Sequence, residues 1–223
     1  MKSLIASLLM AGFALSAVAV DKAELEGRIA KLTVKLDTLQ AQPGKRVPAE
    51  KLRQAQGVVL MDRTKAGFIF AYQGGGGVAM ARDPKTGQWS APAFVKASEP
   101  SLGFQVGGQQ SFVVMVLMTT NAIQALAQGI SNFGGEASGT AGDASGGVDG
   151  AFSASGPPVL VYSDRSGFYG GAALKDDSVS PDAEADVAYY GSALTFKDIL
   201  LEHKGQPGPA AAELARKLEQ FAK

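Results

Sequence analysis

The chain has 223 residues, 46% of them hydrophobic, so it is long enough to bury a sizeable core. Its 21 basic residues balance its 21 acidic ones, which gives no electrostatic case for nucleic acid, because that binding depends on clustered Lys and Arg neutralising phosphates. The sequence has no cysteine, which excludes disulfide bonds and a lipid-modified cysteine, and its 28 glycines favour a β-rich fold over a helical bundle.

The first stretch, MKSLIASLLMAGFALSAVAV, has the features of a signal peptide. Lys2 precedes an apolar run, and Ala17 and Ala19 have the A-x-A spacing of a signal-peptidase site. The apolar run is shorter than the roughly 20 residues that a membrane span needs. We therefore expect cleavage after Ala19, with residues 1–19 removed, and a periplasmic or secreted protein. An uncleaved anchor is the alternative.

Residues 21–41 are predicted to form one helix with a narrow apolar stripe. The stripe follows a 4, 3, 4, 3 spacing and consists of Leu25, Ile29, Leu32, Leu36 and Leu39. Three roles remain open for it: docking on the protein's own core, pairing with a second copy as a short coiled coil, or lying on a membrane. Because AQPGKRVP ends the helix, residues 20–47 are predicted as a helix and linker ahead of a domain at 48–223.

A short helix and several strands are predicted to follow. Pro48 suits the first position of a helix at 48–56, and Gly57 can take the left-handed conformation at its end. Apolar runs predict strands at 57–61, 66–72 and 77–82, and DPKTGQW predicts a turn.

Four consecutive glycines, Gly74, Gly75, Gly76 and Gly77, separate two of these runs. They fit neither a P-loop nor a dinucleotide fingerprint, because a strand-like run follows them in place of a helix. We therefore expect a structural role, as a tight hairpin or bulge. Trp89 follows the turn and is expected to fold back over the sheet as a core anchor.

The second half predicts further strands and short helices. We expect a strand at 111–120 that leads into a helix ended by Gly129, a hairpin at 158–163 and 167–174, a helix opened by Ser180 and Pro181 that runs to Tyr190, a capping box at Thr195 and Asp198, and a helix at 209–222. The small-residue stretch 134–156 is predicted as ordered strands, with a disordered linker as the alternative.

Strands and helices do not alternate regularly along the chain. This order predicts an α+β fold: a mainly antiparallel twisted or barrel-like sheet with an N-terminal helix and short C-terminal helices.

Catalytic and metal-binding patterns are weak. The single histidine, His203, cannot complete a zinc site without cysteine, and no G-x-S-x-G motif accompanies it. Asp182, Glu184 and Asp186 alternate along a predicted helix, so they do not share one face. The sequence therefore predicts a protein that is not an enzyme, with no catalytic residues, metal or cofactor.

An ordered set of motifs spans Pro48 to Leu218: VPAEKLRQAQGVVLM, KAGFIFAYQGGGGVAMARD, GQWSAPAF, LGFQVGGQQSFVVMVLMTT, YSDRSGFYGGAAL and YYG…TFKDIL. Together they resemble the SYLF domain, also called the Ysc84 or DUF500 family. Gln110 and Met118 stand where members often carry Asp and Asn. The resemblance implies lipid binding without catalysis. Eukaryotic members bind phosphoinositides with the help of an amphipathic helix, and some bind actin.

These observations predict an exported, non-catalytic domain that recognises the anionic head groups of a phospholipid membrane. The alternative is an envelope scaffold that assembles as a homo-oligomer through the 21–41 helix. Near-zero net charge requires a local patch for lipid binding. The candidate cations are Lys45, Arg46, Lys51, Arg53, Arg63 and Lys65. An ordinary solvated surface is the other interpretation of these residues.

Overall fold

The structure is a computed structural model, which describes residues 20–67, 71–101, 109–128, 159–164, 167–169 and 179–223. The helices are α1 (Lys22–Gln40), α2 (Ala49–Gln54), α3 (Thr120–Ala127), α4 (Ala183–Tyr190), α5 (Phe196–Leu200) and α6 (Pro209–Phe221). The strands are β1 (Gly57–Gly67), β2 (Ala71–Ala81), β3 (Ala93–Ser101), β4 (Gln109–Leu117), β5 (Val159–Ser163), β6 (Gly167–Tyr169) and β7 (Val179–Pro181).

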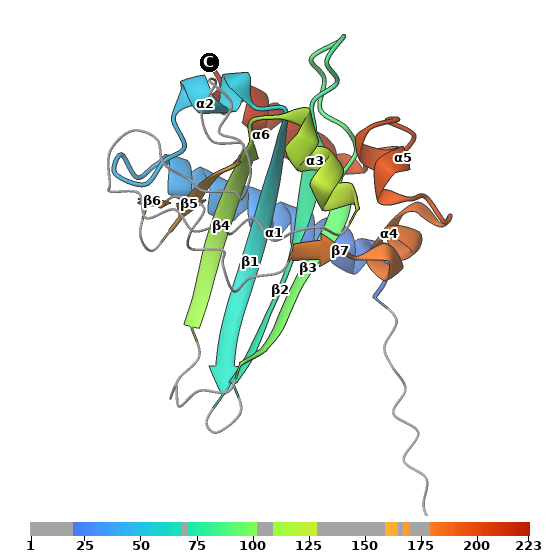
Figure 1. The fold of residues 1–223 in the computed structure, drawn as a ribbon, viewed down its shortest axis with the longest axis horizontal. Coiled ribbons are helices and arrows are strands. Elements are labelled where there is room, and N and C mark those ends of the chain that lie inside the picture. Colours follow the sequence, from blue (N-terminus) through green and yellow to red (C-terminus); the bar gives the residue numbers. More distant parts are fainter. Residues whose placement is uncertain (1–19, 68–70, 102–108, 129–158, 165–166, 170–178) are drawn as a thin grey trace, which may run out of the picture.

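The strands form one sheet in the order β6-β5-β4-β1-β2-β3-β7 (Figure 1). Every neighbouring pair is antiparallel, which confirms the predicted α+β fold with an antiparallel sheet. The hairpin predicted at 158–163 and 167–174 is confirmed where β5 pairs with β6, while residues 158 and 170–174 lie outside the described residues. The barrel-like alternative is wrong, because in the described part of the chain β6 and β7 are edges and the sheet is not closed.

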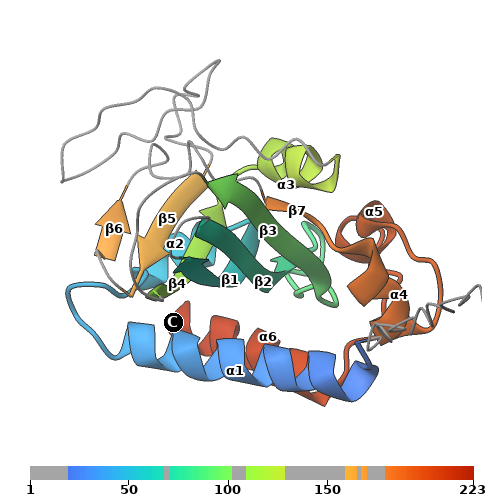
Figure 2. The same ribbon diagram turned by 90° about the horizontal axis from the view of Figure 1, so that it is seen from below.

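Both faces of the sheet are buried, and the alternation of side chains along β1 shows how. Val58 and Leu60 belong to one core, and Val59 and Met61 belong to the other. Helices α1 and α6 lie side by side below the sheet and α3 lies above it (Figure 2). Helix α5 lies beside the β7 end of the sheet, and its buried side chains belong to the same core as those of α3. A strand buried on both faces has no polar alternation, which explains the continuous apolar runs of the sequence.

Helix α1 docks on the protein's own core, the first of its three expected roles. The side chains of its stripe are 0–1% exposed: Leu25, Ile29, Leu32, Leu36 and Leu39. Its polar edge is fixed to α6, because Glu26 Oε2 accepts a hydrogen bond from the Ala210 amide at 2.8 Å. Tyr189 of α4 donates to the other oxygen of the same carboxylate. Glu26 therefore joins three helices at the first turn of α6.

Two predicted helix ends differ from the structure. Pro48 is the N-cap of α2, and Gly57 begins β1 without a left-handed conformation, because Ala55 ends the helix in an extended conformation. Ser180 and Pro181 belong to β7, and the carboxylate of Asp182 caps α4. At Gly57 and at Ser180 and Pro181, residues that local sequence preference assigns to a helix or its end belong instead to strands of the sheet.

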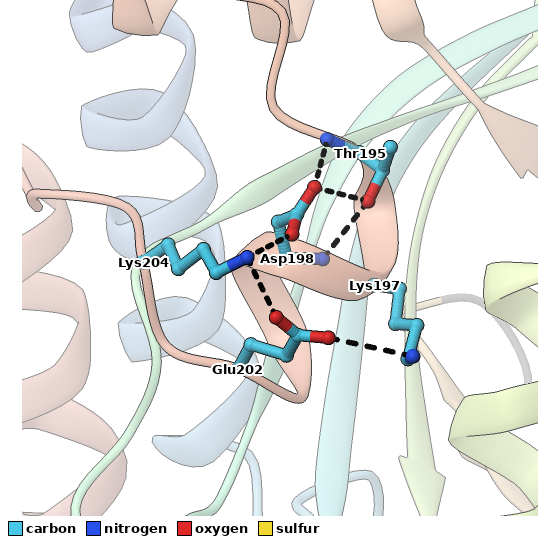
Figure 3. A network of polar contacts seen from close by, with 5 residues as sticks. All are labelled: Thr195, Lys197, Asp198, Glu202 and Lys204. Carbon is cyan, nitrogen blue, oxygen red and sulfur yellow. Dashed lines mark hydrogen bonds and ion pairs between the residues drawn. The ribbon is translucent and has the colours of Figure 1, made fainter.

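The predicted capping box of Thr195 and Asp198 at the start of α5 is confirmed. Figure 3 shows the polar network that extends from it. Lys204 Nζ lies 2.7 Å from Asp198 Oδ1 and 2.7 Å from Glu202 Oε2, and Lys197 pairs with the same glutamate. The hydrogen bonds from Lys204 and Thr195 hold the pKa of Asp198 well below its usual range. This solvated network fixes the turn that follows α5.

The glycine run is an extended segment inside β2, so the predicted hairpin or bulge is wrong. Gly75, Gly76 and Gly77 pair in unbroken register with β1 on one side and with β3 on the other. Only Gly87 and Gly191 have positive φ among the glycines that the structure describes. The strands predicted at 57–61, 66–72 and 77–82 are accordingly two long strands, β1 and β2.

Two predicted segments, the signal peptide at 1–19 and the small-residue strands at 134–156, lie outside the described residues. Within the described ranges, none of the helices has an apolar stretch long enough to span a bilayer.

Candidate functional site

Four of the predicted cations lie in or just before α2, the helix that leads into β1. Lys45 and Arg46 are in the connection between α1 and α2, and Lys51 and Arg53 are in α2. Figure 1 shows α2 near the C-terminus, and Arg53 Nη1 donates to the Ala222 carbonyl at 3.5 Å. We call these four residues the α2 basic cluster.

Two members of the α2 basic cluster are well placed to meet a ligand. Arg46 is exposed and Lys51 is half-buried, and within the described part of the chain neither forms an ion pair. The nearest acid in sequence, Glu50, accepts a hydrogen bond from Gln54 one turn later in α2. Four cations outnumber this one acid, so the local field of the α2 basic cluster is positive, although the whole chain has no net charge.

Lys45 has a structural role that Arg46 lacks. Its ammonium donates to the main-chain carbonyl of Asp164, the residue after β5. The carboxylate of Asp164 in turn accepts from the Phe112 amide of β4 at 3.1 Å. Lys45 thus connects the segment after α1 to the end of β5, next to the β6 edge of the sheet.

This difference predicts that two neighbouring substitutions differ in their effect on thermal stability. Lys45→Ala should lower the melting temperature by about 3–6 °C, because it removes a charge-assisted hydrogen bond worth about 1.5 kcal/mol. Arg46→Ala should leave the melting temperature unchanged, since its side chain is exposed. Thermal unfolding followed by circular dichroism measures both. Equal shifts for the two variants would show that the bond to Asp164 contributes nothing.

Arg63 and Lys65 do not complete the predicted patch. Both lie further along β1, away from α2. Arg63 is only 7% exposed, and it shares the face of the sheet that carries Met61, opposite to α1. The strand alternation places a cation on a buried face, so the six predicted residues do not form one surface.

Trp89 is partly buried and packs against the core on the α1 side of the sheet. The guanidinium of Arg82 lies 4.6 Å from the centre of its ring, and Arg82 Nη2 lies 3.3 Å from Glu219 Oε1 of α6. Trp89 therefore packs beneath a paired cation, and it is less enclosed than the expected core anchor. Nothing in the local sequence signals the contact with Glu219, because it depends on how α6 docks.

Asp186 is a buried carboxyl group that the sequence does not single out. It is 1% exposed, and its Oδ1 accepts a hydrogen bond from the Phe94 amide of β3 at 2.8 Å. Burial raises the pKa of Asp186 to about 7, and the nearby Asp182 adds to this rise while the Phe94 amide opposes it. The carboxyl group holds α4 against the sheet, a structural role.

Metal binding finds no support in the described residues, where His, Asp and Glu form no group of three or more that could hold an ion. His203 Nε2 lies 3.8 Å from a carboxylate oxygen of Asp83. The histidine therefore connects the segment between α5 and α6 to the turn after β2. The described surface therefore offers charged groups for binding and no assembled catalytic set.

Sequence comparisons place this architecture among known proteins. The profile of the Ysc84 family, described as "Las17-binding protein actin regulator", matches residues 98–221. "LAS seventeen-binding protein 3" of Saccharomyces cerevisiae is 32% identical over 180 residues, which cover 79% of this chain and 39% of the yeast protein. "SH3 domain-containing YSC84-like protein 1" of Homo sapiens is 30% identical over 173 residues, which cover 77% of this chain and 50% of the human protein.

The chain thus spans only about two fifths to one half of the length of these relatives. The name of the yeast relative describes a binding protein, and the description of the family adds actin regulation. No solved structure matches the chain. The profile match covers more than half of the 223 residues, and the two relatives agree with it, so the chain belongs to the Ysc84 family, whose shared unit is the SYLF domain.

Proposed function

We propose that this chain is an exported, non-catalytic domain that binds the anionic head groups of membrane lipids through the α2 basic cluster. The observation that supports this most directly is the group of cations in and just before α2 that form no ion pair with the described residues, Arg46 above all. Each Lys or Arg near an anionic membrane contributes about 1 kcal/mol of binding. The signal-peptide pattern at residues 1–19 supports the exported location.

The proposed contact is electrostatic, without insertion of apolar side chains. Among the described residues the exposed large hydrophobic side chains are Val34 and Val187, which lie on different helices. The leucine stripe of α1 is buried in the core, so it is not exposed for insertion into a membrane. Binding that depends on charge alone is screened by salt, so it should weaken steeply as ionic strength rises.

The alternative of a scaffold that self-assembles through α1 loses its main support, because the stripe that would form the coiled coil is buried within one chain. Protein partners of the kind that the relatives' names mention would have to contact another surface. The α2 basic cluster is also a candidate for an acidic protein segment, so the test includes both types of partner.

The lipid proposal is tested by cosedimentation with vesicles of phosphatidylcholine, with and without phosphatidylglycerol. We expect binding only to the anionic vesicles. The double variant Arg46→Glu, Lys51→Glu should bind at least about 30-fold more weakly, because it loses two cations worth about 1 kcal/mol each. Lys22→Glu with Lys85→Glu is the matched control. It changes the net charge equally at exposed positions in the first turn of α1 and in the turn after β2, where neither lysine forms an ion pair with a described residue.

Equal binding by the wild type and the Arg46, Lys51 variant at low salt would contradict the proposal. Binding to an acidic peptide but not to anionic vesicles would replace the lipid with a protein partner. The exported location has its own test, which is the mass of the mature chain in the periplasmic or secreted fraction. We expect it to begin at Val20.

A further inference from the structure

Helix α4 is bonded to the edge of β3 through the backbone of one residue. The amide of Phe94 donates to Asp186 Oδ1 at 2.8 Å, and the Phe94 carbonyl accepts from the Asp182 amide at 2.8 Å. The neighbouring residue, Val95, is paired with Pro181 of β7. The start of α4 therefore continues the cover that β7 gives to this edge.

Two tyrosines connect α4 to other parts of the domain. Tyr189 donates to Glu26 of α1, and its hydroxyl accepts from the amide of Gly208, the N-cap of α6, at 2.9 Å. Tyr190 donates to the Pro92 carbonyl just ahead of β3. Figure 2 shows α4 beside the first turns of α1. Helix α4 thus links the starts of α1 and α6 to β3.

The docking of α4 depends on these contacts, because the helix is short. It has eight residues, and isolated helices shorter than about 12 residues are marginal in water. Its buried side chains are Ala185, Asp186 and Tyr189, each no more than 5% exposed. One of these three is an acid, so the state of its carboxyl group decides how well α4 packs.

The surroundings of Asp186 favour the neutral form of its carboxyl group. Within the described ranges Asp186 forms no ion pair, and the Phe94 amide is its one hydrogen-bond donor. A buried carboxylate without a paired cation is costly, and the charge of Asp182 adds repulsion. Tyr190 is also near, and burial raises the pKa of its hydroxyl, so it stays neutral. Burial accordingly raises the pKa of Asp186 to about 7.

The described charged groups on the elements around α4 do not pair with this carboxylate. On α1, Glu26 is itself an acid, and Lys22 lies over an aromatic ring of α4, 5.2 Å from its centre. On β3, Lys96 is exposed to solvent. His203 and Lys204, in the connection between α5 and α6, pair with other acids. An ionised Asp186 therefore has no compensating cation among the described residues.

We propose that α4 is a pH-dependent switch, which leaves the edge of β3 when Asp186 loses its proton. The first turns of α1 and α6 then loosen, while the centre of the sheet stays folded. In the released helix the carboxyl group returns to its ordinary pKa of 3.8, so release becomes easier as pH rises from about 4 to about 7, by up to about a thousandfold. Because Ala185 and Tyr189 share a core with Leu25 and Ile29, release uncovers the first part of the leucine stripe.

Hydrogen exchange measured by NMR on the full chain at pH 5 and pH 8 tests the switch. Each exchange rate is divided by the intrinsic rate of that amide at the same pH. Four reporter amides at the contacts of α4 are compared with two reference amides that lie opposite each other in β1 and β4. The reporters are Phe94, Gly191, Ile29 and Ala210, and the references are Leu60 and Val114.

At pH 8 the corrected rates of the reporters should be at least tenfold higher than those of the references, because the reporters open without global unfolding. Between pH 5 and pH 8 the corrected rates of the reporters should rise about a hundredfold, since about two of the three pKa units fall in this interval.

Two variants separate the cause of the release from its transmission. Asp186→Asn keeps an acceptor for the Phe94 amide and cannot ionise, so the corrected rates of the reporters should change less than about threefold between the two pH values. Tyr189→Phe removes the hydroxyl that joins α4 to α1 and α6. In this variant the reporters in α1 and α6 should lose most of their pH response, while those at β3 and α4 keep it.

Three results would overturn the switch. Equal corrected rates of reporters and references at pH 8 would show that the opening is global. A full pH response in Asp186→Asn would assign the titration to another group. A wild-type response confined to Phe94 and Gly191 would show that α1 and α6 do not follow α4.

Discussion

Asp186→Asn should make the protein more stable at pH 8 and abolish most of its pH-dependent stability between pH 4 and pH 7. In the wild type the pKa of Asp186 rises from 3.8 to about 7 on folding, because the carboxyl group is buried between α4 and β3. Between these two values the unfolded chain has lost the proton while the folded chain still holds it. The free energy of unfolding therefore falls as pH rises through this window, and it is level above about pH 7.

The size of the effect follows from the shift. Each pKa unit corresponds to about 1.4 kcal/mol, so a rise of roughly three units lowers stability by about 4 kcal/mol across the window. Asparagine keeps an oxygen that can accept from the Phe94 amide and carries no charge at any of these pH values. Urea unfolding at pH 5 and pH 8, followed by the fluorescence of the single tryptophan, measures the difference.

Asp182→Asn is the matched control for this experiment. Its carboxylate caps α4 by accepting from the Ala185 amide at 3.3 Å, and asparagine caps a helix about as well. This variant should keep most of the pH dependence, with a small change because the charge of Asp182 contributes to the raised pKa of Asp186. The same pH slope in the wild type and in Asp186→Asn would show that Asp186 ionises as an ordinary carboxyl group.

Asp186 illustrates which part of the fold the sequence could not predict. In the run Pro181-Asp-Ala-Glu-Ala-Asp it has the appearance of one more acid in the first turn of a helix, where acidic residues are common. Its burial comes from β3, which lies some ninety residues earlier in the chain. A pattern of spacing within one helix cannot show which strand the helix packs against.

The long elements were predictable because their periodicity is strong. The spacing of Leu25 to Leu39 predicted α1, and the apolar runs predicted most of the sheet. What α1 packs against was left open, because the same stripe suits a core, a coiled coil or a membrane. Lys45 and Arg46 show the same limit at the site. They are neighbours in sequence, and only the position of Asp164 gives Lys45 a structural role that Arg46 lacks.

The glycine run shows why local preference failed in β2. Four glycines in succession have little strand propensity, and turns are their commonest setting. Pairing with β1 and β3 on both sides nevertheless keeps the segment extended. At Gly75 and Gly77 the requirement for glycine comes from small size, because the backbone of β1 occupies the place of a side chain. That requirement becomes visible only when both strands are in position.

Gly77→Ala should therefore be strongly destabilising. A Cβ atom at this position would lie 2.1 Å from the Leu60 carbonyl oxygen and 2.9 Å from Met61 Cα, both of which belong to the backbone of β1. Such contacts are relieved only if the central pair of strands moves apart. Overpacking of this kind costs about 1–3 kcal/mol and occasionally more, and the rigid backbone places this site at the upper end. Urea unfolding at constant pH measures the loss.

Gly76→Ala is the matched control, one residue away in the same strand. Its added Cβ would meet only the end of the Arg28 side chain, at 3.2 Å, and a flexible guanidinium can move. Alanine also restricts the unfolded chain more than glycine does, which favours folding by roughly 0.5–1 kcal/mol in a strand. We therefore expect Gly76→Ala to be neutral or slightly stabilising. Equal losses in the two variants would contradict the backbone contact at Gly77, because a shared loss would come from the extended conformation itself.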